Sequence, residues 1–463
     1  MKNKPDEFMN SIFELCSNIY YGPYRKKYKM ISTGSNDLPM PRIWKKLITQ
    51  EVKNDLVYMW YTAPGGLAAE RNYLKMYHEI LSTKGKSLVS KKRDVCMTLG
   101  ACQAAKIIFD YLIQRKKIKK VLILGYSYSL FERECRRYNL MYQELSSCKK
   151  GKNLPSVSEI KNSKSDADLF ILSLPSNPTG EIWRQNEFES FLKYIKESKK
   201  IVLLDIVGYF QISERNNLLF DYAIRKIGIE EQVYIINSFS KSDSVPAFRL
   251  GYLIGCGDLY QFAANSQYDE MMNVPIFPVI PMLFSLHARI IFMNRKYRWE
   301  IDEKRFKSIA YNLLKESFAL LSPKWEKKIY HLFYGNKFNR YYRTYVNEQL
   351  KNERIILRNY EYMLNVLKDD IVDWIHMESG FNVIIELKGT EFFEEYEFCK
   401  KLLSYNGLSV LTESCFTIEQ RRENRFWIRI SLAKEESYFK KSIIMLRKFL
   451  IILKENNYKL NTR

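Results

Sequence analysis

The chain has 463 residues, 46% of them hydrophobic and 27% charged, which is enough to bury a large core in two or more domains of a globular, soluble protein. Its longest apolar stretch, residues 274–286, contains three prolines and is shorter than the roughly 20 residues that cross a bilayer, which excludes a membrane-spanning segment. The formal charge of +22 comes mostly from lysine pairs between the apolar segments, and no helix-turn-helix pattern lies beside them. We therefore interpret these lysines as a solvated surface, or as one that attracts anionic substrates and acidic partners, and not as a nucleic-acid site.

Short apolar runs alternate with helical patterns along the first half of the chain. The runs that predict strands lie at Val95, Val121–Leu124, Leu169–Leu174, Ile201–Leu204, Val233–Ile236 and Leu250–Ile254. Such alternation is typical of βαβ units, in which a helix joins two parallel strands. The sequence therefore predicts an α/β fold with a mainly parallel central sheet.

The chain changes character after this region. Residues 294–349 are rich in charged and aromatic residues, and their helical spacing predicts a helical insertion on the main body. The residues that carry this spacing are Phe306, Ile309, Leu313 and Phe318. We interpret the insertion as a structural extension, with a lid or a docking element for a partner as the alternative. Residues 46–293 then form a large domain, and residues 1–45 together with 350–463 form a smaller α+β domain.

The cysteines, the histidines and the N-terminus bear on location and on metals. The eight cysteines are scattered without a metal-type spacing, which fits reduced thiols in the cytoplasm. The four histidines are far apart and form no ligand motif, so we expect no metal. The charged N-terminus leads into no long apolar stretch, so we expect no secretory signal and a cytoplasmic protein.

Polar side chains stand at the ends of two predicted buried strands. After the first strand, a turn of Asn177, Pro178, Thr179 and Gly180 presents an amide. The second strand stops at Asp205, and a carboxylate there needs a cationic partner to offset its desolvation. A protonated pyridine nitrogen would be such a partner.

A lysine and an arginine stand eight residues apart in the segment that runs from Ser238 to Gly251. The amine of Lys241 can condense with an aldehyde, and the guanidinium of Arg249 can clamp a phosphate. Pyridoxal phosphate carries both groups, although the segment alone is also compatible with a solvated polar loop. Near the C-terminus, Arg429 alternates with apolar neighbours and so lies on the opposite strand face, where it suits a carboxylate.

In their shared order along one chain, these segments resemble the pyridoxal-phosphate enzymes of fold type I, specifically the class I/II aminotransferase family, over about residues 32–432. The resemblance implies that Lys241 forms the internal aldimine with the cofactor. It implies that Asp205 pairs with the pyridine nitrogen and that Asn177 bonds the phenolic oxygen. The motifs all lie just past strand ends, where open α/β sheets bind ligands.

The resemblance also assigns residues around the phosphate and the substrate. Arg249 is expected to hold the phosphate, with the hydroxyls of Ser238 and Ser240 close by. Arg429 is expected to grip the substrate carboxylate, with the turn at Gly34 on the substrate side of the N-terminal arm.

Three further cofactor contacts are expected by the same resemblance. A helix begins after Gly100, and its first N–H groups, those of Ala101 and Cys102, suit a phosphate unless the segment is an ordinary strand-to-helix turn. Tyr128 matches an aromatic ring stacked on the pyridine, with a packed surface or core ring as the alternative. Tyr61 matches a tyrosine that reaches the phosphate of a neighbouring subunit, which requires a homodimer.

The chain departs from the family pattern at one position. The family usually has a tyrosine three residues after the aspartate, but this chain has Gly208 there, followed by Tyr209. A one-residue bulge would bring Tyr209 to the phenolic oxygen, and without the bulge that hydrogen bond is absent.

The function predicted from these residues is that of a pyridoxal-phosphate-dependent aminotransferase, which moves an amino group between an amino acid and a 2-oxo acid. The alternative on the same scaffold is a lyase, a cyclase or a decarboxylase of a specialised amino-acid pathway. A non-catalytic binding protein that kept the fold is a third possibility, which the intact set of site residues argues against.

Overall fold

The computed structural model describes residues 4–17, 29–53, 63–88, 92–272, 278–318, 331, 333–335, 337–419 and 425–460. Its centre is a seven-stranded sheet in the order β2-β8-β7-β6-β5-β3-β4. The strands are β2 (Asp94–Leu99), β3 (Lys120–Leu124), β4 (Met141–Leu145), β5 (Leu169–Ser173), β6 (Ile201–Asp205), β7 (Val233–Ser238) and β8 (Leu250–Gly255). β8 pairs antiparallel with both of its neighbours, and the other pairs are parallel. This confirms the predicted α/β fold with a mainly parallel sheet.

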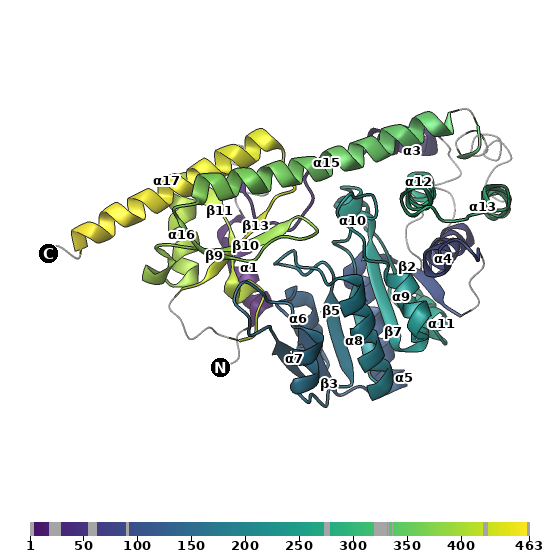
Figure 1. Cartoon of the computed structure of the whole chain (residues 1–463), viewed down its shortest axis with the longest axis horizontal. Helices are drawn as coiled ribbons and strands as arrows, with labels where there is room; N and C mark the ends of the chain where they lie inside the picture. Colours follow the sequence, from purple (N-terminus) through teal and green to yellow (C-terminus); the bar gives the residue numbers. More distant parts are fainter. Residues whose placement is uncertain are drawn as a thin grey trace.

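Helices cover both faces of this sheet (Figure 1). On one face, helices α5 (Ala101–Lys116), α6 (Ser129–Arg137) and α11 (Leu259–Met271) pack on alternate strand residues such as Ile123 and Leu203. The residues between them, such as Leu122 and Leu204, join a larger core on the opposite face. Successive strand side chains point to opposite faces, so strands buried on both faces need the nearly continuous apolar runs seen in the sequence.

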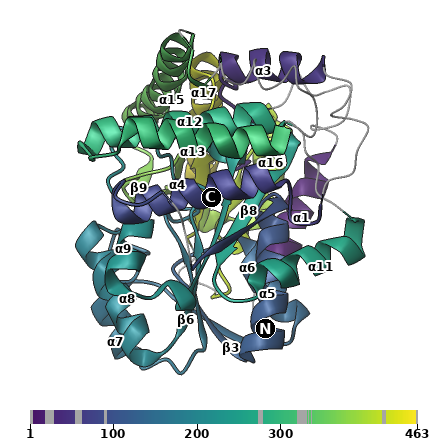
Figure 2. The same ribbon diagram turned by 90° about the vertical axis from the view of Figure 1, so that its right-hand side faces the viewer.

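The larger core holds most of the remaining helices of this half of the molecule. They are α3 (Arg42–Val52), α4 (Ala68–Thr83), α8 (Gln185–Ser198), α9 (Phe220–Ile227), α12 (Val279–Tyr297) and α13 (Glu303–Phe318). In Figure 2, α12 and α13 lie alongside α4. Phe306 of α13 is buried in this core, with Ile309 and Leu313 packed against it, as the helical spacing predicts.

A second core surrounds a four-stranded sheet in the order β12-β13-β10-β9. Its strands are β9 (Ile371–Trp374), β10 (Asn382–Leu387), β12 (Leu411–Thr412) and β13 (Trp427–Ser431). The helices beside it are α1 (Pro5–Leu15), α16 (Glu395–Asn406) and α17 (Glu436–Leu460). A short parallel pair, β1 (Lys29–Met30) with β11 (Leu408–Ser409), brings the N-terminal segment to this C-terminal core. The smaller connecting elements are α7 (Val157–Asn162) and α10 (Phe239–Ser242).

The helix α15 (Phe338–Leu367) joins the two cores (Figure 1). Tyr345 and Val346, near its start, belong to the core of the seven-stranded sheet, whereas Ile356 and Met363 belong to the second core. The boundary predicted between residues 349 and 350 falls inside this continuous helix. The limits predicted for the domains stay predictions.

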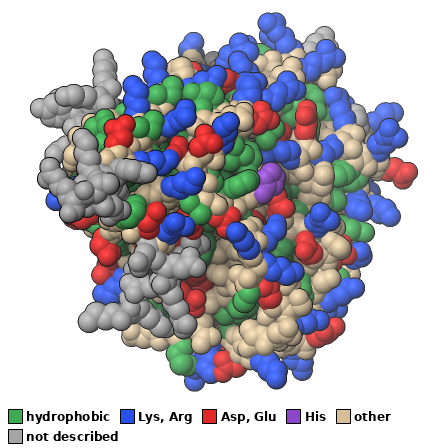
Figure 3. All heavy atoms as spheres, turned by 60° about the vertical axis from the view of Figure 1, so that its left-hand side comes forward, with side chains coloured by type: hydrophobic (Ala, Val, Ile, Leu, Met, Phe, Trp, Pro, Cys, Tyr) green, Lys and Arg blue, Asp and Glu red, His purple; other side chains and the backbone are tan. Residues whose placement is uncertain are grey.

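The surface carries the strong positive charge of the sequence. On the face shown in Figure 3, Lys and Arg side chains are spread over the molecule, with Asp and Glu side chains between them. Within the described part of the chain, no helix is long and apolar enough to cross a membrane. The described residues also contain no cluster of three or more His, Cys, Asp or Glu side chains that would hold a metal ion.

Candidate active site

A cavity of about 270 Å³ opens between the carboxyl ends of the parallel strands and the second core. It brings together nearly all of the site residues predicted from the sequence. Those that line it are Gly34, Ala101, Cys102, Tyr128, Asn177, Asp205, Ser238, Ser240, Lys241, Arg249 and Arg429. These residues come from positions almost 400 apart in the chain. The ends of the parallel strands gather most of them at one edge of the sheet, and β13 of the second sheet brings Arg429 to the same cavity.

Asp205 ends β6 and presents a carboxylate in the cavity. The N–H of Val207 donates to its Oδ1 at 2.9 Å, and the hydroxyl of Ser173 lies 3.5 Å from Oδ2. Burial raises the pKa of Asp205 from 3.8 to about 6, and these hydrogen bonds offset only part of the effect. Asp205 forms no ion pair within the described residues, so its carboxylate suits a cationic ligand atom.

Lys241 lies in the short helix α10, which follows β7 directly. Ser238 caps this helix, because its hydroxyl accepts from the N–H of Ser240 at 3.0 Å. Burial, assisted by the positive charge of Arg429, lowers the pKa of Lys241 from 10.5 to about 8. A lysine with such a pKa has a substantial neutral fraction near pH 8 and acts as a nucleophile or a base.

Gly100, Arg249 and the start of α5 form a cradle for an anion. Gly100 has a φ of 78°, and a Cβ placed there would lie 2.6 Å from Nη2 of Arg249. The guanidinium of Arg249 donates to the carbonyls of Pro246 and Leu99 at 3.2 and 3.1 Å. The first N–H groups of α5 have no acceptor within the helix, and together with the guanidinium they suit a phosphate.

Arg429 is almost completely buried in β13, with 3% of its surface exposed. Its Nη1 donates to Oδ1 of Asn177 at 2.9 Å, its Nη2 donates to the carbonyl of Ser32, and its guanidinium lies 4.5 Å from the ring centre of Phe416. A Cβ on Gly34, where φ is 61°, would lie 2.8 Å from Nη2. Glycine is therefore required at this position for the guanidinium to lie where it does.

Asn177 has its amide oriented by two donors. Besides Arg429, Nδ2 of Asn382 lies 3.4 Å from Oδ1 of Asn177, and Oδ1 of Asn382 in turn accepts from the hydroxyl of Ser431 at 2.7 Å. Because both donors approach the carbonyl oxygen of Asn177, its NH₂ group is the part of the amide that remains for a ligand in the cavity.

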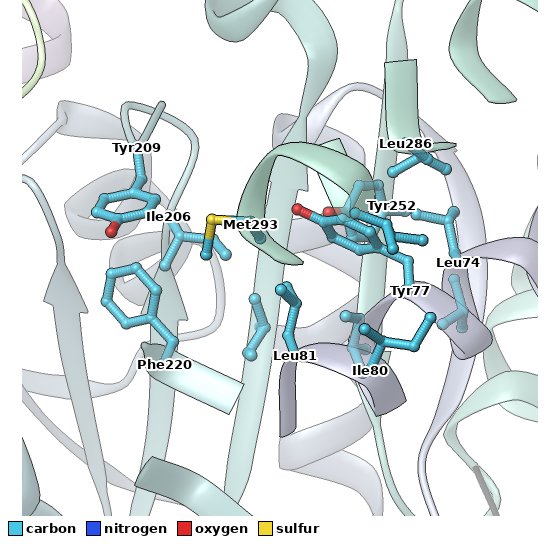
Figure 4. Packing of buried hydrophobic residues seen from close by; sticks show 14 of the residues in the cluster. Leu74, Tyr77, Ile80, Leu81, Ile206, Tyr209, Phe220, Tyr252, Leu286 and Met293 are labelled. Atoms are coloured by element: carbon cyan, nitrogen blue, oxygen red, sulfur yellow. The ribbon is translucent and has the colours of Figure 1, made fainter. Parts of the chain in front are cut away.

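Tyr209 is the site prediction that the structure contradicts. Its hydroxyl donates to the carbonyl of Leu218 at 2.8 Å, and its ring packs edge-on against Phe220 at 4.8 Å (Figure 4). No bulge turns it toward the cavity, which Gly208 lines instead. Apolar burial and a satisfied hydroxyl hold Tyr209 in the core, so the prediction that it contacts the cofactor is wrong. Tyr61 lies outside the described residues.

Sequence reasoning missed the apolar wall of the cavity. Its side chains are those of Met9, Phe13, Leu130, Phe381 and Leu411. Met9 and Phe13 share one face of α1, as residues four apart do. That spacing predicts an amphipathic helix, but nothing in it indicates that the helix closes a cavity against distant strand ends. Asn382 was also missed.

The fold and the cavity define an α/β protein of fold type I with its site at the edge of a mainly parallel sheet. The sequence profile of the aminotransferase class I and II family matches residues 29–278, more than half of the chain, and the chain belongs to that family. Members of this family generally depend on pyridoxal phosphate.

Individual aminotransferases are also similar to this chain in sequence or in fold. An aspartate aminotransferase of Thermococcus kodakarensis is 30% identical over 137 residues, which are 30% of this chain and 34% of that protein. One from Sulfurisphaera tokodaii is 26% identical over 50% of this chain and 56% of its own. The matched segments thus span between a third and somewhat over half of these relatives. The solved aromatic aminotransferase of Pyrococcus horikoshii shares the fold, with a TM-score of 0.67 and 16% identity over 97% of this chain and 99% of that one.

Proposed function

We propose that this protein is a pyridoxal-phosphate-dependent aminotransferase that moves an amino group between an amino acid and a 2-oxo acid. The observation that carries the proposal is the convergence of four charged groups on one cavity. Lys241 and Asp205 lie at adjacent strand ends, Arg249 lies beside the start of α5, and Arg429 faces them from the second sheet.

The residues of the cavity fit pyridoxal phosphate. The Gly100 cradle and the hydroxyl of Ser240 would take the phosphate, and the buried carboxylate of Asp205 would take the protonated pyridine nitrogen. The NH₂ group of Asn177 would donate to the phenolic oxygen, and Tyr128, which lines the cavity, would lie on the ring. When bound, the cofactor supplies an aldehyde that condenses with amines and a ring that accepts electrons.

Three charged residues of the cavity then have separate roles in the reaction. The guanidinium of Arg429 binds the substrate carboxylate and so fixes which bonds at Cα face Lys241. The amine of Lys241 holds or moves the proton at Cα, because burial lowers its pKa to about 8 and so lets it both accept and release a proton at mildly alkaline pH. With the cofactor bound, the carboxylate of Asp205 would keep the pyridine nitrogen protonated, which would let the ring accept electron density from the substrate.

The apolar wall favours a substrate with an apolar side chain. The cations that the described residues place in the cavity are Lys241, Arg249 and Arg429, and each already has a task in this proposal. Met9, Phe13 and Leu411 offer apolar surface to a side chain, which stabilises binding by burial. We therefore propose aromatic or long aliphatic amino acids as donors.

The proposal includes a cytoplasmic homodimer. All eight cysteines are free thiols, which supports a reducing compartment. The dimer is expected from the match of Tyr61 to a tyrosine that contacts a neighbouring subunit. Sedimentation velocity of the purified protein tests this state, and a monomer at micromolar concentration contradicts it.

The deciding experiment is an absorption spectrum of the purified protein with pyridoxal phosphate, recorded before and after an amino acid is added, beside Lys241→Ala. We expect a visible band that depends on Lys241 and converts to a pyridoxamine spectrum. Glutamate formed from 2-oxoglutarate should match the donor consumed. A band that never converts while substrate disappears without an acceptor would favour the lyase, cyclase or decarboxylase alternative. A colourless protein would refute cofactor binding.

A further inference from the structure

A buried carboxylate lies two residues after Lys241. Asp243 ends the turn of α10, and only 1% of its surface is exposed. Its Oδ2 accepts from the guanidinium of Arg289, which is 3% exposed, and from the hydroxyl of Ser242 at 2.9 Å. The same nitrogen of Arg289 donates to the Ser242 hydroxyl at 2.8 Å, and its guanidinium lies 5.1 Å from the ring centre of Phe239. Arg289 of α12 therefore contacts three residues that flank Lys241 in sequence.

The other carboxylate oxygen of Asp243 is held by further elements. The hydroxyl of Tyr345, from α15, donates to Oδ1 at 2.6 Å, and that of Ser285, from α12, donates at 3.2 Å. The indole of Trp44, from α3, donates to the Ser285 hydroxyl at 2.7 Å. Donors from α12 and α15 thus converge on one carboxylate, and α3 supports one of these donors, the hydroxyl of Ser285.

The N-terminal segment also holds the turn, because the carbonyl of Lys241 accepts from Nδ2 of Asn36 at 2.7 Å. The turn is therefore held at two points, by the N-terminal segment at Lys241 and by α12 and α15 at Asp243. The ammonium of Lys241 itself forms no ion pair within the described residues, so its backbone is the part of Lys241 that these contacts fix.

A buried ion pair is weak evidence for stability, because well-packed apolar residues often replace one at no loss. Its better-supported role is to select one arrangement of the chain. Here the arrangement selected is that of the turn carrying the amine, and near-attack geometry is sensitive to displacements of about 1 Å.

We infer that Asp243 and Tyr345 are positioning residues that hold the Lys241 turn in register with the cavity. Through Tyr345, α15 takes part in the active site although the helix begins in the segment predicted to be a structural extension. The inference rests on the function proposed for Lys241, and its test includes a readout that needs no cofactor.

The test compares Tyr345→Phe with Tyr360→Phe. Both tyrosines lie on α15 and are buried, and each variant removes one hydroxyl, but Tyr360 bonds to His376 at 3.1 Å in the second core. Two properties are measured for each variant: the rate of Lys241 acetylation against pH, followed by mass spectrometry on protein without cofactor, and kcat and KM for amino transfer. Thermal unfolding provides the measure of stability.

We expect Tyr345→Phe to lower kcat about tenfold with KM changed less than about twofold, since the amine is misplaced while Arg429 still binds substrate. We expect the midpoint of Lys241 acetylation to rise by about one pH unit as the amine gains water. The groups that face Lys241, namely Arg429, Asp37, Cys102, Arg249 and Asp205, are the same in both variants. Tyr360→Phe should leave both properties unchanged.

Equal values of kcat and of the acetylation midpoint in the two variants would overturn the inference, whatever their unfolding temperatures. If the wild-type protein binds no pyridoxal phosphate, the proposed function fails, and the acetylation midpoints still decide whether Tyr345 positions Lys241. Asp243→Asn, which keeps the shape but removes the charge beside Arg289, should exceed Tyr345→Phe in its effect on the midpoint, and a smaller effect also counts against the inference.

Discussion

Replacing Gly34 by alanine tests whether the missing side chain at Gly34 leaves the space that the guanidinium of Arg429 occupies. A Cβ at position 34 would lie 2.8 Å from Nη2 of Arg429, where ordinary contact begins at 3.4 Å, so the guanidinium must retreat by the difference, about 0.6 Å. Its Nη1 donates to Asn177 at 2.9 Å, and N–H···O bonds weaken beyond roughly 3.2 Å. The guanidinium therefore cannot move by this amount and keep its present hydrogen bonds.

The expected loss has two parts. The positive φ of 61° costs an alanine roughly 1–2 kcal/mol of folding free energy. The displaced guanidinium loses part of a charge-assisted hydrogen bond to the substrate carboxylate, which is worth about 1.5–3 kcal/mol. Only the second part concerns binding, and it corresponds to a rise in KM of about 10- to 100-fold, with kcat changed less.

Gly151 provides the matched control. Its φ is 68°, but the nearest atom to a Cβ there is the carbonyl oxygen of Trp374, 4.0 Å away. Gly151→Ala should therefore lose a similar free energy of unfolding in urea while its KM stays at the wild-type value. Steady-state kinetics with a 2-oxo acid acceptor measure the difference. A wild-type KM for Gly34→Ala, or an equal rise in both variants, would refute the role assigned to Gly34 and Arg429.

Three further outcomes follow from the site. Burial raises the pKa of Asp205 to about 6 in the folded protein without cofactor, so the folded protein binds a proton there more tightly than the unfolded chain does. The contribution of Asp205 to the free energy of unfolding should therefore fall by on the order of 3 kcal/mol as pH rises from about 4 to 6. Asp205→Asn should flatten this part of the stability profile in urea titrations, and an unchanged profile would contradict the burial argument. Arg429→Lys should raise KM for the amino acid about 10- to 100-fold, since an ammonium cannot replace the forked guanidinium that reaches both Asn177 and a carboxylate. An unchanged KM would exclude Arg429 from substrate binding. Phe13→Ala should lower kcat/KM for phenylalanine about tenfold and leave that for alanine nearly unchanged, and equal losses would argue against an apolar subsite.

Local chemistry made the central part of the site predictable from the sequence. Asn177, Asp205 and Lys241 each follow an apolar run, and parallel strands end at the same edge of a sheet, so their meeting follows from strand order alone. Arg429 was predictable because strand alternation places its side chain on the opposite face from those of Ile428 and Ile430.

Other features depend on contacts that no local pattern records. The orientation of Tyr209 depends on the carbonyl of Leu218 nine residues away and on an apolar pocket beside it. Three partners of Asp243, namely Ser285, Arg289 and Tyr345, come from positions 42 to 102 residues further along the chain, and a single aspartate in a polar segment gives no sign of them. For the same reason, the apolar wall from α1 could not be assigned to the cavity.

The helix α15 bears on how the chain can be divided. Its first half contributes Tyr345 and Val346 to one core and its second half contributes Ile356 and Met363 to the other. At about 1.5 Å per residue, its 30 residues form a helix about 45 Å long that packs against both halves of the molecule. Cutting the chain at residue 349 would leave an apolar stripe without a partner on each fragment, so we expect the two sheets, although separate in architecture, to unfold together.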